Sequence, residues 1–114
     1  MMFKLSSRSL KNLKGVHPDL VAVVQLAITR TPIDFMVIEG LRTLERQKEL
    51  VRSGDSRTLN SRHLTGHAVD IVPLTNGKVS WAWPQYYKLA PVIMDCAMEL
   101  GVSLEWGGDW TTLK

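Results

Sequence analysis

The 114-residue sequence predicts a single α+β domain, in which a small, mainly antiparallel sheet is packed with helices. Three observations lead to this fold class. Segments with apolar residues at helical spacing alternate with short apolar runs rich in strand formers. Asn76-Gly77, a strong hairpin signal, connects two such runs. No repeat, linker or low-complexity segment divides the chain, so residues 1–114 are expected to share one core.

Two helices are expected first. Ser7 or Ser9 could cap a short opening helix. His17-Pro18-Asp19 predicts the start of a second helix, because proline is favoured at the first helical position and aspartate in the first turn. Its apolar residues repeat at helical spacing as far as about Arg30.

A buried strand and a third helix follow. The run 35–38 is rich in strand formers and ends at Gly40. Thr43 is expected to cap a helix that runs to about Arg52, and Gly54 can supply the left-handed residue after it.

The second half predicts the remaining elements. A polar loop over 54–62 precedes a strand over 68–72, and Asn76-Gly77 turns the chain into a short return strand. A long helix is expected over 84–100, followed by a short strand over 102–104.

Charge and cysteine content narrow the function. Fourteen basic against eleven acidic residues give a net charge of only +3, which argues against nucleic acid as a partner and is compatible with an anionic polymer. The single cysteine, Cys96, allows neither an intramolecular disulfide nor a cysteine-based zinc cluster. No apolar run is long enough for a signal-peptide core or a membrane span, so synthesis in the cytoplasm is expected.

The segment from Ser61 to Asp70 contains most of the groups that could bind a metal. His63, His67 and Asp70 lie within eight residues, and imidazole and carboxylate are ordinary zinc ligands. Such groupings also occur in surface loops and at polar strand ends. The two histidines would share a face only in a helix, whereas Gly66 and the apolar run after it favour a loop and then a strand. In that strand His67 and Asp70 would point to opposite faces.

Three ordered motifs resemble a known family. The pattern Ser-x-His-x-x-Gly-x-Ala-x-Asp resembles the signature of the zinc D,D-carboxypeptidase and L-alanyl-D-glutamate endopeptidase family, which includes VanY-type enzymes and phage endolysins. The resemblance implies a Hedgehog/D,D-peptidase-like single domain. The residues that carry it are Ser61, His63, Gly66, Ala68 and Asp70, with Gly40-Leu41-Arg42-Thr43 and Gln47 upstream and Trp106-Gly107-Gly108-Asp109-Trp110 downstream.

The resemblance also implies roles for individual residues. His63 and Asp70 would be ligands of Zn²⁺. Arg42 would face the cleft and pair with a substrate carboxylate or the developing oxyanion, and Ser61 would lie beside the zinc and orient the peptide. His67 is not a ligand in this family and is interpreted as a residue at the strand start or the site rim.

The sequence departs from the family pattern at its end. An acid followed three residues later by a histidine is expected soon after Trp110, as general base and third ligand, and residues 111–114 contain neither. His17 is better explained as a surface or capping residue than as a replacement third ligand. Asp109 and Glu105 are better explained as a turn residue and a strand-end acid than as a replacement general base. We therefore expect a chain that lacks the C-terminal acid-x-x-His segment to be inactive or badly impaired.

The resulting hypothesis is a bacteriolytic zinc metallopeptidase that hydrolyses peptidoglycan stem peptides by metal-activated attack of water. L-alanyl-D-glutamate is the favoured bond, and D-alanyl-D-alanine stays open. The complete form is expected to be a monomer that reaches the cell wall through a holin-made opening. The alternative is an inactive truncated homologue that binds cell-wall fragments or binds metal weakly.

Four aromatic residues surround the start of the predicted long helix. Trp81, Trp83, Tyr86 and Tyr87 could line a groove for sugar or peptide. Aromatic side chains at a helix entrance more often pack as core, and that is the expectation here.

Overall fold

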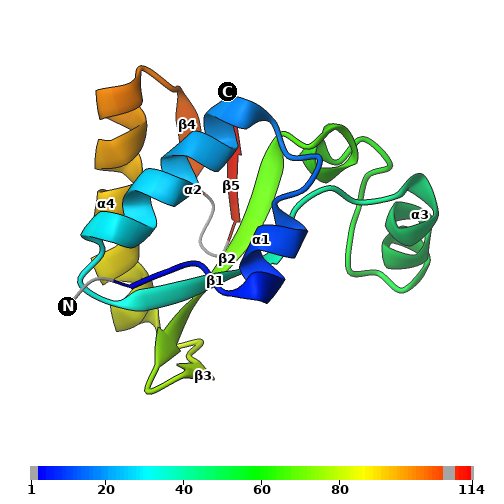
Figure 1. Cartoon of the computed structure of the whole chain (residues 1–114). Coiled ribbons are helices and arrows are strands. Elements are labelled where there is room, and N and C mark those ends of the chain that lie inside the picture. The colour runs from blue at the N-terminus through cyan, green and yellow to red at the C-terminus, as the bar shows by residue number, and fades with distance from the viewer. Residues whose placement is uncertain (1–2, 107–109, 114) are drawn as a thin grey trace.

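The chain has the expected α+β architecture, shown in Figure 1. The computed structural model describes residues 3–106 and 110–113. The helices and strands follow in the order α1 (Ser7–Asn12), α2 (Pro18–Arg30), β1 (Asp34–Glu39), α3 (Leu44–Arg52), the 3₁₀ turn η1 (Arg62–Thr65), β2 (Ala68–Thr75), β3 (Lys78–Val79), α4 (Trp83–Leu100), β4 (Leu104–Trp106) and β5 (Trp110–Leu113).

The sheet is antiparallel at every described pairing. Its order is β1-β2-β5-β4, and β3 pairs with the far end of β2. The connection between β2 and β3 has positive φ at both Asn76 (52°) and Gly77 (79°), which is the backbone that a two-residue type I′ turn requires. The hairpin predicted from Asn-Gly is therefore confirmed.

Two strands differ from the expectation. The strand predicted over 102–104 begins only at Leu104, because the N–H of Val102 bonds to the carbonyl of Ala97 at 2.8 Å and closes the end of α4. Strand β5 was not predicted, and it lies between β2 and β4. Because of β5, the β2–β3 hairpin and strand β4 belong to one sheet.

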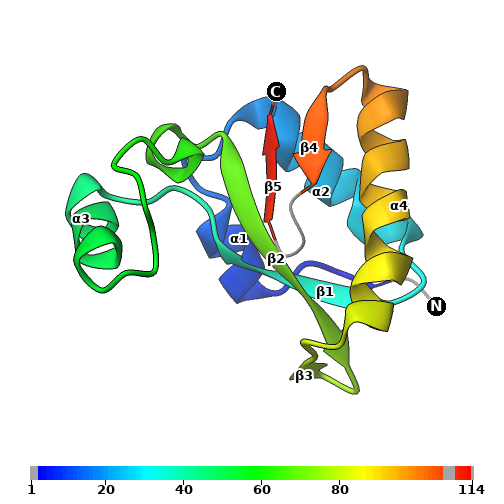
Figure 2. The same ribbon diagram turned by 180° about the vertical axis from the view of Figure 1, so that it is seen from behind.

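The helices pack mainly on one side of the sheet. In Figure 1 α1 and α2 lie in front of the strands, and in Figure 2, from behind, β2 and β5 lie in front of them. Helix α4 packs along α2, and a bidentate ion pair between Arg30 and Glu99 joins their C-terminal ends. The side chains between these layers include fully buried Leu20, Phe35, Ile71, Leu89 and Ile93.

Helix α1 covers the outer edge of the sheet. Its cap is Ser6, whose hydroxyl accepts from the N–H of Ser9 at 3.1 Å, so the expectation of Ser7 or Ser9 as the cap was wrong. Ser9 is instead fully buried, and its hydroxyl accepts the N–H of Val37 at 3.0 Å. Asn12 donates to the carbonyl of Val37 at 2.9 Å. These bonds occupy polar groups that edge strand β1 would otherwise expose.

The caps of the next two helices are confirmed. The ring nitrogen Nδ1 of His17 accepts the N–H of Asp19 at 3.1 Å, so His17 is a capping residue, as interpreted. Thr43 accepts the N–H of Arg46 at 3.1 Å at the start of α3. No helix in the described part of the chain is both long enough and apolar enough to cross a membrane.

The aromatic residues near α4 only partly follow the expectation. Tyr86 is buried, but the side chains of Trp81, Trp83 and Tyr87 are largely exposed. The prediction that all four pack as core was therefore wrong for three of them.

Candidate active site

A β-bulge brings two carboxylates to the same end of the sheet. Val37 pairs with Ile71, and both side chains are in the core. The pairing then shifts, so that Glu39 rather than Ile38 lies opposite Asp70. Because side chains alternate between faces along a strand, this extra residue aims Glu39 to the same region as Asp70.

The Ser-x-His-x-x-Gly spacing builds a tight turn that presents His63. The hydroxyl of Ser61 accepts the N–H of His63 at 3.2 Å and caps η1. Gly66 ends η1 with a φ of 74°, and a Cβ at this position would lie 2.3 Å from the carbonyl oxygen of Gly15. Both the positive φ and the close approach require glycine. The motif therefore fixes where the imidazole stands relative to β2.

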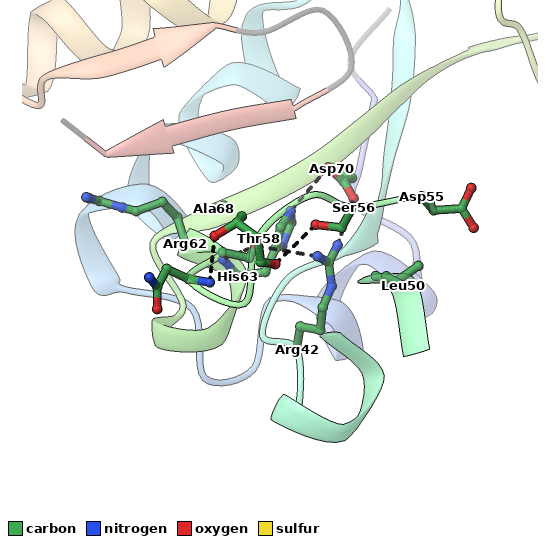
Figure 3. Close-up of a pocket in the computed structure, with 11 residues that line it drawn as sticks. Arg42, Leu50, Asp55, Ser56, Thr58, Arg62, His63, Ala68 and Asp70 are labelled. Atoms are coloured by element: carbon green, nitrogen blue, oxygen red, sulfur yellow. Dashed lines mark hydrogen bonds and ion pairs between the residues drawn. The ribbon is translucent and has the colours of Figure 1, made fainter. Parts of the chain in front are cut away.

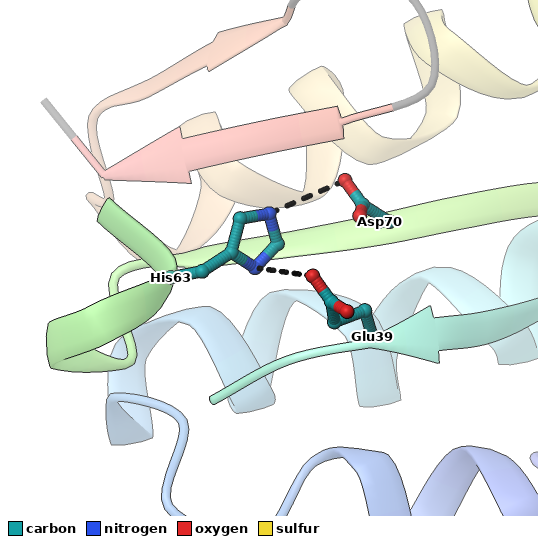
Figure 4. Close-up of side chains that lie close together, drawn as sticks. All are labelled: Glu39, His63 and Asp70. Carbon is teal, nitrogen blue, oxygen red and sulfur yellow. Dashed lines mark ion pairs between the residues drawn. The ribbon is translucent and has the colours of Figure 1, made fainter. Parts of the chain in front are cut away.

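The His63 ring is oriented by two contacts. Figure 4 draws the ring with its acidic neighbours Glu39 and Asp70. Its Nδ1 lies 2.8 Å from the carbonyl oxygen of Gly40, which can only accept, so Nδ1 carries the hydrogen. Its Nε2 faces Asp70, with 3.3 Å between Nε2 and Oδ1. Only 9% of the His63 side chain and 21% of the Asp70 side chain are exposed. This orientation points Nε2 at a carboxylate in a shielded place.

The protonation of His63 is coupled to Asp70. Burial lowers the pKa of His63, but the hydrogen bond to Asp70, the negative charge of Asp70 and the Gly40 carbonyl raise it by more. The net pKa of His63 lies above its usual value, which favours an Nε2–H that donates to Asp70. A metal at Nε2 would replace that proton.

Glu39, His63 and Asp70 form a group that could hold a metal ion, because one ligand atom from each lies within 4.8 Å of the others. Glu39 was not among the predicted site residues. The available sequence signal was an acid three residues before Arg42 at a strand end. Figure 4 shows that Glu39 approaches the Nδ1 side of the ring, at 4.0 Å, whereas Asp70 faces Nε2.

Arg42 is held in the site by several acceptors. Its Nε donates to Oε1 of Glu39 at 2.6 Å, and Nη2 bonds to the same oxygen. Its Nη1 donates to Gln47 at 2.7 Å and lies 3.4 Å from the hydroxyl of Ser61. Nη2 lies 3.9 Å from Oδ2 of Asp70, and 11% of the Arg42 side chain is exposed. The guanidinium is therefore fixed beside the His63–Asp70 pair.

Gln47 explains the second half of the Gly-x-Arg-Thr-x-x-x-Gln element. Its side chain is fully buried on α3. Its carbonyl accepts from Arg42, while its amide donates to the hydroxyl of Ser56 at 2.8 Å and to the carbonyl of Thr58 at 2.5 Å. Gln47 thus connects the guanidinium to the polar loop over 53–61.

The predicted site residues line one cavity of about 540 Å³. Arg42, His63 and Asp70 contribute to its wall (Figure 3), and so does Ser61. The remaining wall comes from α3, from the loop that Gln47 holds and from Ala68 on β2. A cavity with a carboxylate, an imidazole and a guanidinium can accommodate and orient a small polar segment.

His67 lies apart from this group. Its ring packs against His17 with 5.2 Å between centroids, and its Nδ1 is 2.6 Å from the hydroxyl of Thr65. Strand β2 begins one residue later, at Ala68. Glu105 lies in β4 opposite Thr112, while Asp109 is outside the described residues.

Comparison with known proteins gives consistent matches. Residues 1–113 match a family model described as "Phage L-alanyl-D-glutamate peptidase". An L-alanyl-D-glutamate peptidase of Escherichia phage T5 is 32% identical over 114 residues, which cover 96% of this chain and 83% of that protein. A protein of the same name from Listeria phage A118 is 32% identical over 108 residues, 92% of this chain and 37% of that protein.

A solved structure agrees over almost the whole fold. The crystal structure of Serratia marcescens L-Ala D-Glu endopeptidase ChiX matches with a TM-score of 0.92 and 46% sequence identity. The match covers 97% of this chain and 90% of that chain. The fold is therefore shared with an L-Ala D-Glu endopeptidase.

Proposed function

Because the chain belongs to the phage L-alanyl-D-glutamate peptidase family, we propose that it hydrolyses the amide between L-alanine and D-glutamate in peptidoglycan stem peptides. His63 and Asp70 would hold the metal, and Arg42 and Ser61 would bind the peptide beside it. The observation that carries this proposal is the His63 Nε2–Asp70 Oδ1 pair on the wall of the cavity. The site of action would be the cell wall, reached after another protein opens the membrane.

The donor pair fits zinc. Two ligand atoms on a tetrahedral zinc ion, each about 2.0–2.1 Å from it, lie about 3.3 Å apart. Nε2 of His63 and Oδ1 of Asp70 are 3.3 Å apart. The bond from Nδ1 to the Gly40 carbonyl is the usual second contact of a metal-binding histidine, and it fixes the tautomer that leaves Nε2 free. Bound zinc would supply a Lewis acid that polarises the scissile carbonyl and acidifies water.

Glu39 has a different role in this proposal. Its carboxylate already accepts two bonds from Arg42, and it approaches the nitrogen of His63 that is occupied by Gly40. We assign Glu39 to holding Arg42 rather than to the metal. The guanidinium in turn balances the negative charges of Glu39 and Asp70, so that the two carboxylates can lie close together in a partly buried place.

Arg42 and Ser61 would position the substrate. D-Glutamate carries a carboxylate close to the scissile amide, and a guanidinium fixed by Glu39 and Gln47 matches a carboxylate or a developing oxyanion. Ser61 lies between Arg42 and His63 and presents a hydroxyl to the same cavity. Neither group needs to move far to meet a peptide in the cavity.

The third ligand and the general base implied by the resemblance have no match among residues 111–114. We therefore propose that residues 1–114 by themselves, with His63 and Asp70 as the two ligands, bind zinc weakly and turn over slowly. The relatives from phage T5 and from Serratia extend beyond the matched region, since 83% and 90% of their lengths are covered.

The test is hydrolysis of purified peptidoglycan, followed by identification of the new amino termini. Cleavage at L-alanyl-D-glutamate exposes a glutamate amine, whereas D,D-carboxypeptidase activity releases free D-alanine. Arg42→Lys should lower kcat/KM by about 100-fold, because lysine cannot reproduce the forked donor geometry. Arg46→Lys on the exposed face of α3 is the matched control and should leave it unchanged.

The outcomes separate the two functions considered. Amine release that depends on Arg42 supports the peptidase. The alternative is a binding protein. It would be supported if wall peptides were retained in a zinc-dependent way but no amine was released, even by a chain extended by the acid-x-x-His segment. Release of D-alanine alone would overturn the assigned bond.

A further inference from the structure

Three exposed aromatic side chains lie at or just before the start of α4. Trp81, Trp83 and Tyr87, called here the aromatic patch, are 63%, 60% and 71% exposed. The rings of Trp83 and Tyr87 are stacked, with 6.2 Å between centroids and 24° between planes. Large aromatic rings in water lose the stabilisation of burial, so a cluster of them indicates a surface that binds something.

The aromatic patch is anchored rather than loose. The ring of Trp83 also lies 5.8 Å from that of Tyr86, which is buried in the fold. Trp83 and Tyr87 share the first turns of α4, where Pro84 restricts the backbone. Pre-ordered rings lose little conformational freedom when a ligand binds.

Along the chain, the charged residues nearest the patch are lysines, while the acidic Asp34 lies on β1 opposite Leu74. Between Asp70 and Asp95 the sequence contains no acidic residue, and its charged residues are Lys78 and Lys88, both exposed. Lys78 precedes the patch on β3, and Lys88 follows Tyr87 on α4. This charge complements a polymer that bears carboxylates.

The patch is connected to the candidate active site by strand β2. Figure 2 shows β3 and the start of α4 together at one end of β2, while η1 lies at the other end. Leu74, four residues beyond Asp70, pairs with Val79 of β3. At about 3.3 Å per residue this distance along β2 is about 13 Å. An extended polymer can span this distance along β2.

We propose that the aromatic patch binds the sugar rings of the peptidoglycan glycan strand, while the cavity receives the attached stem peptide. This inference rests on the proposed function, which makes the wall polymer the substrate. The C–H faces of pyranose rings are weakly positive and pack on the negative faces of aromatic rings. The indole N–H and phenol O–H groups at the ring edges can bond to sugar hydroxyl and acetamido oxygens.

The available area favours a sugar chain over a second copy of this protein. Three aromatic side chains at these exposures present about 400 Å². A stable protein interface buries about 800 Å² on each partner. A few sugar rings stacked on the patch need no larger surface.

The experiment uses soluble N-acetylglucosamine oligomers and the tryptophan fluorescence of the chain, with a chelator present. Saturable binding is expected, with Trp83→Ala and Tyr87→Ala weakening it by about 10-fold or more. Met98→Ala is the matched control, because Met98 is 79% exposed at the other end of the same helix. His63→Ala should also leave sugar binding unchanged, so failure of the zinc site and failure of the patch are distinguishable.

A second readout compares two substrates. Patch variants should hydrolyse intact wall more slowly but cleave a sugar-free stem peptide at the rate of the unmodified chain. Absence of oligosaccharide binding up to about 10 mM would overturn the proposal. Concentration-dependent dimers that the patch variants abolish would also overturn it and assign the surface to self-association.

Discussion

The buried amide of Gln47 allows a direct test of how the cavity wall is held. Replacing Gln47 by methionine keeps the length and approximate volume of the side chain but removes its bonds to Arg42, Ser56 and Thr58. Because α3 and the loop over 53–61 are joined through this side chain, we expect Gln47→Met to destabilise the protein and to loosen that loop.

The size of the effect follows from the contacts. Three hydrogen bonds at a net 0.5–1.5 kcal/mol each give about 1.5–4.5 kcal/mol. The cavity can admit water to the freed Thr58 carbonyl and Arg42 donor, which removes the upper part of this range. We therefore expect a loss of about 2–3 kcal/mol in the free energy of unfolding. For a domain of this size that lowers Tm by about 8–12 °C.

Urea unfolding and limited trypsin digestion measure the two effects. The Gln47→Met variant should cleave faster after Arg57, which is exposed in the loop. Lys48→Met is the matched control, because Lys48 is the exposed neighbour on the same helix. If Gln47→Met changed the unfolding free energy by less than about 0.5 kcal/mol and left cleavage after Arg57 unchanged, the role assigned to Gln47 would be wrong.

Three further predictions concern the scaffold. In urea unfolding, Gly66→Ala should lower the free energy of unfolding by about 3 kcal/mol or more, and Gly54→Ala by about 1 kcal/mol. Both glycines have positive φ, but only at Gly66 would a Cβ meet a backbone oxygen. Equal losses in the two variants would contradict this. Ser9→Ala should cost about 1–2 kcal/mol through the lost bond to β1, with exposed Ser7→Ala as a control that stays near zero. Glu99→Gln should lower the urea midpoint at pH 7, since the hydrogen bond and charge of its arginine partner on α2 lower the pKa of Glu99. The difference should vanish as the pH falls below about 4.5 through that lowered pKa, and a difference that persists at pH 2 would refute it.

Local signals predicted the helices well because helix ends depend on nearby residues. His17-Pro18 and Thr43 fixed two starts through side-chain caps, and the left-handed glycines at 54 and 101 follow α3 and α4. The Asn76-Gly77 hairpin likewise depends only on local backbone conformation. These features need no knowledge of what packs against them.

The missed features depend on contacts between distant segments. Strand β5 forms because two partners, β2 and β4, lie on either side of it. Glu39 enters the site because a bulge shifts its register against Asp70, and a bulge leaves no clear sequence mark. His63 and Asp70 could be named from the motif resemblance, but their 3.3 Å separation and the tautomer set by Gly40 required the structure.

The aromatic residues near α4 also show that burial depends on contacts between distant segments. Their position before a long helix predicted packing, and Tyr86 does pack. Trp81 precedes α4, and the exposure of Trp83 and Tyr87 depends on how the first turns of α4 pack against the rest of the fold.

The most direct test of the central claim is calorimetric titration of the chelator-treated chain with Zn²⁺, beside its His63→Ala, Asp70→Ala and His67→Ala variants. The account predicts one zinc per chain, binding weakened by at least about 10-fold in the first two variants, and unchanged binding in His67→Ala. Zinc binding that survives loss of His63 or Asp70, or that disappears with His67, would contradict it.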